Sequence, residues 1–206
     1  PNEQHIVIAH LGNGGSVTAV AQGKSVDTSM GMTPTDGLVM GTRSGSLDPG
    51  ILIHLMTTYG YDAEQLDSLI NKQSGLLGLS ALSSDMRELE EAEGAGSDAA
   101  TLAIEGCCYR LAQNIAAMAT ALPRLDALVF TAGIGENSPL VRERTVRWLG
   151  QLGIVIDAEL NHGAARKAAT KISPESAAVA VWVIPTNEEL MIANEAIELI
   201  TAAGEQ

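Results

Sequence analysis

Two short apolar runs in this chain each end in a glycine-rich polar turn. The first covers residues 5–10 and continues into Leu11, Gly12, Asn13 and Gly14. The second covers residues 127–132 and continues into a Gly-Ile-Gly-Glu-Asn-Ser segment that ends at Ser138. Apolar runs of this length are typical of buried strands. Glycines after a strand let backbone N–H groups approach an anion, because no Cβ stands in the way. The pair of turns predicts a nucleotide site in an α/β fold.

The composition favours a globular protein with a small anionic ligand over a nucleic-acid or membrane binder. Apolar residues make up 46% of the 206 residues and charged residues 18%, which is typical of a folded core. The formal charge is −13, whereas nucleic acid and anionic membranes need clustered Lys and Arg. A polyanionic ligand would therefore need backbone dipoles, a few arginines and a metal ion.

No targeting or membrane segment is apparent, and the two cysteines carry no site. No apolar stretch reaches transmembrane length, and nothing at the N-terminus resembles a signal peptide. Cys107 and Cys108 are adjacent within a helical pattern, so their side chains point in different directions. We interpret them as small core residues in a reducing compartment, and we expect a cytoplasmic location.

The order of predicted elements argues against a Rossmann domain. Strands are predicted at residues 5–10, 16–21, 25–29, 126–132 and 177–184, helices at residues 50–59, 63–72, 98–122, 139–152 and 188–201, and loops at residues 31–50 and 75–80. The first glycine turn leads into a strand rather than a helix, and Ser138 stands where a third glycine would be. The order predicts a mixed sheet flanked by helices, as in ribonuclease-H-like and actin-like nucleotide-binding domains.

Phosphoryl transfer needs hydrogen-bond donors around the phosphates, a cation on the moving phosphoryl group and a carboxylate on a divalent metal. Gly12, Asn13 and Gly14 can offer N–H groups and an amide to phosphate oxygens, although Asn-Gly is also the commonest hairpin dipeptide. His10 can assist that site or be a core histidine. Arg43, between two glycines in the long loop, can reach a phosphoryl group or be a surface arginine.

Three further places can contribute. Asp85 and Arg87, in a polar loop, can clamp ribose hydroxyls or form a solvated charge pair. Residues 133–137 precede a helix that starts near Pro139, so their N–H groups can hold a ligand or their glycines can serve tight packing. Glu188 and Glu189 stand where a strand meets a helix, suited to Mg²⁺ or to the helix dipole.

Taken in order, seven segments of the chain resemble the acetate kinase family, which includes the propionate kinases. They are HLGNGGS at residues 10–16, VDTSMG at 26–31, GLVMGTRSG at 37–45, SGLLG at 74–78, SSDMR at 83–87, FTAGIGENS at 130–138 and IPTNEEL at 184–190. The resemblance implies the fold of the acetate and sugar kinase, Hsp70 and actin superfamily. It also implies reversible transfer of the ATP γ-phosphoryl group to acetate or propionate, giving an acyl phosphate and ADP.

The resemblance also implies roles for individual residues. Arg43 corresponds to the arginine that stabilises the transition state, and Glu188 corresponds to the ligand of Mg²⁺, with Mn²⁺ as an alternative metal. The implied ATP and ADP contacts are His10, Leu11, Gly12, Asn13 and Gly14 for the phosphates, and Asp85, Met86, Arg87, Gly133, Ile134, Gly135, Glu136 and Asn137 for ribose and adenine.

The chain departs from the family pattern in two respects. Ser46 stands where the family usually carries aspartate, which removes a charge near Arg43. Family members are about twice as long, and the catalytic segments of their N-terminal half do not occur here. We therefore expect this chain to be the C-terminal nucleotide-binding half of such a protein. We expect it to bind adenine nucleotide but to have little kinase activity alone.

The implied domain division places the nucleotide domain at residues 1–189, incomplete at its N-terminus, and a terminal helix at residues 190–206 that packs on the other half. The apolar residues expected to lie partly uncovered on that helix are Leu190, Ile192, Ile197 and Leu199. The family dimerises through this half, so a homodimer is expected.

Two other protein classes remain open. A non-catalytic nucleotide-binding module of the actin or Hsp70 type would use the same turns as a switch. A Rossmann oxidoreductase fits less well, because both the strand order and the glycine spacing differ. The preference for acetate, propionate or butyrate stays open as well.

Overall fold

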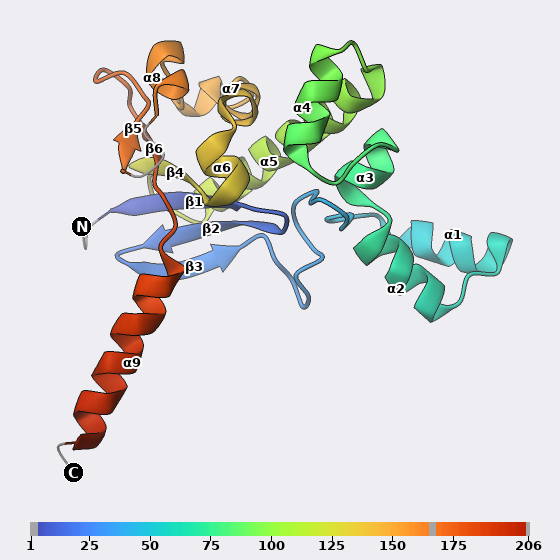
Figure 1. The fold of residues 1–206 in the computed structure, drawn as a ribbon, viewed down its shortest axis with the longest axis horizontal. Helices are drawn as coiled ribbons and strands as arrows, with labels where there is room; N and C mark the ends of the chain where they lie inside the picture. Colours follow the sequence, from blue (N-terminus) through green and yellow to red (C-terminus); the bar gives the residue numbers. More distant parts are fainter. Residues whose placement is uncertain (1–3, 165–167, 205–206) are drawn as a thin grey trace.

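The computed structural model describes residues 4–164 and 168–204. Within the last helix, the side chains of residues 188, 198, 199 and 201–204 lie outside the described part, and Leu199 is among them. Six strands form one mixed sheet in the order β3-β2-β1-β4-β6-β5 (Figure 1). The strands are β1 His5–Leu11, β2 Gly15–Ala21, β3 Lys24–Thr28, β4 Ala127–Thr131, β5 Thr170–Lys171 and β6 Ala180–Val183.

The sheet combines antiparallel hairpins with parallel pairs of strands. β1 pairs with β2 and β2 with β3 in antiparallel fashion, whereas β4 is parallel to β1 and to β6. The buried face of β1 and β2 follows from a strict alternation of buried and half-buried residues, as expected for a period of two residues. The prediction of a mixed sheet flanked by helices is confirmed.

The helices vary widely in length. They are α1 Pro49–Tyr59, α2 Ala63–Lys72, α3 Gly75–Ser80, α4 Met86–Gly94, α5 Asp98–Thr120, α6 Ala132–Asn137, α7 Pro139–Val146, α8 Ala158–His162 and α9 Glu188–Gly204, with a 3₁₀ turn at Gly150–Leu152. α5 supplies the largest apolar stripe, and Ile104, Leu111 and Ile115 on it are fully or almost fully buried against the sheet. Asp48, Asp62 and Ser97 cap α1, α2 and α5 by accepting backbone hydrogen bonds.

Several predicted boundaries are wrong. Residues 75–80 are a helix rather than a loop, because Leu76 is buried and the first N–H groups bond to a neighbouring loop. Asp85 caps a helix, α4, that was not predicted, and the second glycine-rich segment is itself the helix α6. The helix predicted at 139–152 ends at Val146, and α8 and β5 were missed. Short helices are marginal by propensity alone, so tertiary packing decides them.

Two helices expose long apolar side chains. α1 has no buried residue, and Ile53 and Tyr59 on it are 62% and 67% exposed. α9 extends away from the sheet (Figure 1), and Leu190, Ile192 and Ile197 are 53%, 67% and 61% exposed, as the sequence predicts. Over the described residues, no helix combines the length and the apolar character that crossing a membrane requires.

Candidate nucleotide and phosphoryl-transfer site

Three neighbouring strands bring the predicted site segments to one edge of the sheet. β1, β4 and β6 are parallel, with His10 opposite Thr131 and Phe130 opposite Val183. Their carboxyl ends therefore point the same way, and the segments that follow them lie side by side. Ligands of open α/β sheets bind at this edge. The two glycine-rich segments and the approach to Glu188 meet there.

The first glycine segment is the turn of the β1–β2 hairpin. Leu11 pairs with Gly15, and the Gly12 N–H donates to the carbonyl of Gly14 at 2.9 Å. The carbonyl of Asn13 accepts from Gly41 N at 3.1 Å. The backbone of this segment is therefore the hairpin turn that Asn-Gly favours. The same turn is hydrogen-bonded to the loop that carries Arg43.

Arg43 lies against this turn. A Cβ added to Gly14 would lie 3.2 Å from the Arg43 Nη1 atom, so the guanidinium occupies the space that the missing side chain leaves. Nη1 also lies 3.7 Å from the Met40 sulfur. None of the ion pairs found among the described residues includes Arg43. A cation without a carboxylate partner beside a glycine turn is suited to an incoming phosphoryl group.

The first turn of α3 fixes the Arg43 loop. Leu76 N donates to the carbonyl of Met40 at 2.8 Å, and Leu77 N donates to that of Gly41 at 3.0 Å. Gly75 has φ +65°, and a Cβ there would lie 2.2 Å from the Met40 oxygen, so only glycine fits. Sequence reasoning missed this brace, although the Ser-Gly-Leu-Leu-Gly segment at 74–78 marked its place.

Ser46 closes the other end of the loop. Its hydroxyl donates to Asp36 Oδ1 at 2.5 Å and accepts from Gly37 N at 3.0 Å. The bond from Ser46, followed by one from Gly37 N to Asp36 Oδ1 at 2.8 Å, holds the pKa of the Asp36 carboxyl below its ordinary value. Ser46 thus serves as a contact within the loop.

Asp85 and Arg87 form the solvated charge pair that was the simpler interpretation. Asp85 caps α4 through Arg87 N at 2.9 Å, and its carboxylate accepts from Arg87 Nε and Nη2 at 3.1 and 2.6 Å. The side-chain bond from Arg87 is the main reason that the pKa of Asp85 falls to about 2. Ser84, which precedes the pair, lies beside the Arg43 loop, because a Cβ on Gly41 would lie 3.1 Å from the carbonyl of Ser84. The nucleotide role of the pair stays a prediction.

The second glycine segment differs from the prediction, because its residues form α6 rather than a turn. The chain passes from β4 into α6 through Ala132, which has φ +64°, a strained value for a residue other than glycine. Gly133 and Glu136 line an open pocket of about 390 Å³ together with His10, Thr186, Asn187 and Glu189. The Asn137 side chain bonds the carbonyl of Gly133 at 2.8 Å. Gly135 is buried.

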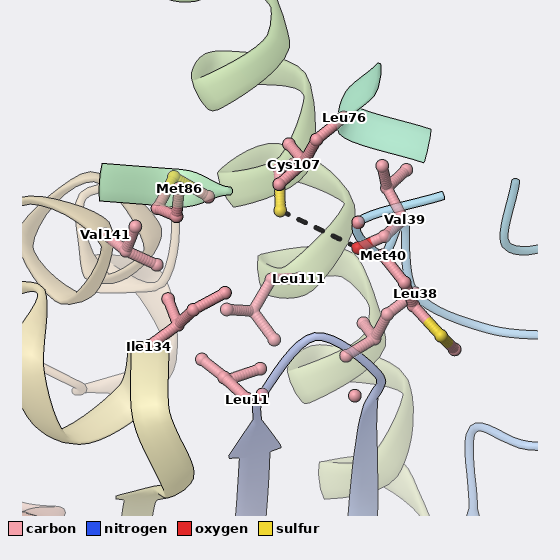
Figure 2. Close-up of a pocket in the computed structure, with 13 residues that line it drawn as sticks. Leu11, Leu38, Val39, Met40, Leu76, Met86, Cys107, Leu111, Ile134 and Val141 are labelled. Atoms are coloured by element: carbon pink, nitrogen blue, oxygen red, sulfur yellow. Dashed lines mark hydrogen bonds between the residues drawn. The ribbon is translucent and has the colours of Figure 1, made fainter. Parts of the chain in front are cut away.

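Three of the predicted contact residues face the core. Figure 2 shows Leu11, Met86 and Ile134 pointing toward a shared apolar space beside Leu111. This cavity measures about 20 Å³ and lies beneath the first turn, lined in part by Gly12 and Gly41. Side chains in this position support the turn, so any nucleotide contact of these three residues runs through their backbone.

The cysteines are core residues, as predicted. The Cys107 thiol donates to the carbonyl of Val39 at 3.8 Å at the wall of the same cavity (Figure 2). Burial raises the pKa of Cys107 to about 12 and also raises that of Cys108. Both cysteines are free.

Arg142 is a site-supporting residue that sequence reasoning missed. Its side chain is 1% exposed, yet no carboxylate is among its hydrogen-bond partners. The guanidinium donates to the carbonyls of Gly135 and Glu136 at 2.8 and 3.1 Å, and to two oxygens of Asn161. It therefore ties the end of α6 to α8. Burial lowers the pKa of Arg142 to about 10.

The predicted metal ligand falls partly outside the described structure. α9 begins at Glu188, but its side chain is not among the described ones. Within the described residues, no group of three or more His, Cys, Asp or Glu side chains is placed to hold a metal ion. Mg²⁺ is usually held by one or two carboxylates together with substrate phosphates and water. The role of Glu188 as a metal ligand stays a prediction.

Known proteins with the same sequence pattern and fold are acetate and propionate kinases. Acetate kinase from Shewanella pealeana is 53% identical over 96% of this chain and 50% of its own length. The crystal structure of Porphyromonas gingivalis acetate kinase matches 97% of this chain with a TM-score of 0.92 and 44% identity. That of a Francisella tularensis propionate kinase matches 94% with a TM-score of 0.87 and 44% identity.

The family model for the acetokinases matches residues 1–194. The chain spans about half the length of the curated and solved relatives named above. Both the sequence pattern and the arrangement of the sheet edge agree with this match. The chain belongs to the Acetokinase family.

Proposed function

We propose that this chain is the nucleotide-binding half of a carboxylate kinase, which transfers the γ-phosphoryl group of ATP to acetate or propionate and runs in both directions. The position of Arg43 Nη1 against Gly14 carries this proposal. It sets a fixed cation beside a backbone turn at the edge where α/β sheets bind ligands. The names of the relatives support the acceptor class.

In the proposed reaction, a carboxylate oxygen of the acceptor attacks the γ-phosphorus, and the bond to the β–γ bridging oxygen breaks. Gly12, Asn13 and Gly14 line the phosphates, and Arg43 stabilises the charge on the equatorial oxygens of the moving group. Bound Mg²⁺ would neutralise charge on the β- and γ-phosphates, held on the protein side by Glu188. The Asp85–Arg87 pair and α6 flank the adenosine.

The chain alone is proposed to bind nucleotide with little turnover. Its relatives are about twice as long, and an acceptor site needs residues on both sides of the phosphoryl group. The exposed apolar face of α9, with Leu190, Ile192 and Ile197, is proposed to pack on the other half. Residues 1–189 would then form the nucleotide domain.

The exposed helix α1 is proposed as a homodimer contact. Ile51, Ile53, Met56 and Tyr59 are 51%, 62%, 49% and 67% exposed. Exposed apolar side chains gathered on one helix favour association. α1 lies at the end of the molecule opposite the N-terminus and α9 (Figure 1), where a preceding half would join.

Calorimetric titration with ADP and Mg²⁺ tests nucleotide binding, and a hydroxamate assay for acyl phosphate tests turnover. We expect saturable binding of ADP, little acyl phosphate from this chain, and formation of acyl phosphate by a chain that includes both halves. Absence of ADP binding by this chain would contradict the proposal. A two-half enzyme that binds ADP but needs no carboxylate acceptor points to a nucleotide switch instead.

A further inference from the structure

One threonine hydroxyl joins the segments that follow β4 and β6. Thr186 lies after β6, two residues before the start of α9 at Glu188. Its hydroxyl oxygen lies 3.0 Å from each of three atoms: Ala132 N, Thr131 Oγ1 and Glu136 Oε1. Its backbone N–H also donates to Glu136 Oε1, at 2.9 Å.

The hydrogen-bonding capacity of the hydroxyl fixes the direction of each bond. A threonine hydroxyl donates once and accepts twice. A carboxylate can only accept, so the Thr186 hydroxyl donates to Glu136. It then accepts from the N–H of Ala132 and from the hydroxyl of Thr131. All three positions are filled.

The same bonds hold a strained residue. Ala132 has φ +64°, a conformation that costs an alanine of order 1–2 kcal/mol and that surrounding contacts must maintain. The hydroxyl of Thr186 accepts a hydrogen bond from the N–H of Ala132. The backbone conformation at the start of α6 therefore depends on the side chain of Thr186, which belongs to the segment that leads to Glu188.

We propose that Thr186 is a positioning residue that couples the adenosine-side segment α6 to the metal-side segment, and that Glu136 serves this link rather than touching nucleotide. The inference rests on the proposed function. Binding of nucleotide and binding of Mg²⁺ then reinforce each other, because each ligand would contact one of the two segments that Thr186 joins. By linkage the effect is the same in both directions.

Four purified forms of this chain test the coupling: wild type, Thr186→Val, Thr186→Ser and the remote control Thr120→Val. Valine keeps the shape of threonine and removes the hydroxyl, whereas serine keeps the hydroxyl. The Kd for ADP is measured by calorimetry in EDTA and in excess Mg²⁺. The ratio of the two values measures the coupling, and thermal melting of the free proteins checks that each is folded.

We expect Mg²⁺ to tighten ADP binding to the wild type and Thr186→Val to reduce that ratio by about fivefold, the value of one hydrogen bond of about 1 kcal/mol. Thr186→Ser and Thr120→Val should keep the wild-type ratio. A purely structural role would lower the melting temperature and leave the ratio unchanged, which would overturn the inference.

Glu136→Gln provides a second check. Its amide oxygen still accepts from Thr186, so a positioning Glu136 predicts near wild-type ADP affinity, whereas a large loss would mean that its charge contacts the ligand and would overturn the proposed role. A wild type that binds no ADP defeats the proposed function, and the inference with it. A wild type that binds ADP with Mg²⁺ but shows an unchanged ratio in Thr186→Val defeats the inference alone.

Discussion

The two glycine-rich segments have similar compositions and different structures. The first is a hairpin turn between antiparallel strands, and the second is a short helix that follows β4, a strand parallel to both of its neighbours. In the first, Gly14 leaves room for the Arg43 guanidinium. In the second, Gly135 is buried close to the backbone of Phe130. Glycine thus marks a close approach in both segments, and the neighbouring residues decide the secondary structure.

The two segments also differ in how they are held. The turn is braced from the ligand side, by the Arg43 loop and the start of α3. α6 is braced from behind, by the buried Arg142. We therefore expect changes near the turn to affect chemistry and changes behind α6 to affect stability.

Replacing Arg43 with alanine should have the largest effect on activity. In an enzyme that contains both halves, we expect the turnover number to fall about 10³-fold, because a charge aimed at the transition state is lost. The ADP affinity of this chain should change little, and Arg43→Lys should recover part of the rate. A normal turnover number in the alanine variant would remove Arg43 from the mechanism.

Replacing Arg142 with methionine should have the largest effect on stability. Buried carbonyls of Gly135, Glu136 and Asn161 would lose their donor, and we expect the free energy of unfolding to fall by about 3 kcal/mol. Thermal melting measures this loss. Arg147→Met is the matched control: Arg147 is 55% exposed and pairs with Glu105 at the surface, so its loss should stay below about 1 kcal/mol. Equal losses of unfolding free energy in the two variants would contradict a stabilising role of Arg142 behind α6.

Alanine substitution in each glycine segment tests whether the first segment affects turnover and the second affects stability. A Cβ on Gly14 would crowd Arg43, whereas a Cβ on Gly133 meets nothing within 4 Å. Gly14→Ala should lower turnover about tenfold through displacement of the arginine, with little change in melting. Gly133→Ala should raise the unfolding free energy of the free protein by about 0.5 kcal/mol, because alanine favours helix. The reverse pattern would mean that the two segments have exchanged roles.

The smallest expected effect is the pH dependence of the Asp85–Arg87 pair. The pKa of Asp85 is about 2 in the fold against an ordinary 3.8. Its contribution to stability is therefore present above about pH 4 and is lost as the pH falls from 4 to 2. The pair is exposed, so the contribution is small. Wild type should therefore be slightly more stable than Asp85→Asn, which keeps the helix cap, above about pH 4, and this difference should disappear as the pH falls from 4 to 2.

The sequence predicted the sheet better than the helices. Strand positions and their order follow from apolar runs bounded by glycine, and these were confirmed for β1, β2 and β4. Helices of six residues such as α3 and α6 have no periodicity to detect. Their formation depends on contacts with distant segments, such as the carbonyl of Met40 with Leu76 N. Local patterns do not contain those contacts.

The candidate site was predicted in part. Arg43 and the Gly12–Gly14 turn were expected together and lie together. Leu11, Met86 and Ile134 face the core (Figure 2), because alternation and helical phase place their side chains opposite to the ligand edge. Arg142 and Thr186 were missed, because a buried arginine and a bridging threonine have no sequence signature of their own.

Amide hydrogen exchange with and without ADP and Mg²⁺ tests most directly whether both glycine segments belong to one nucleotide site. The proposed site predicts slower exchange in residues 10–15 and 132–137 together on addition of ADP, with residues 41–45 following when Mg²⁺ is present. α1 should not change. Protection of only one segment, or of neither while ADP binds, would contradict a single site at this edge of the sheet.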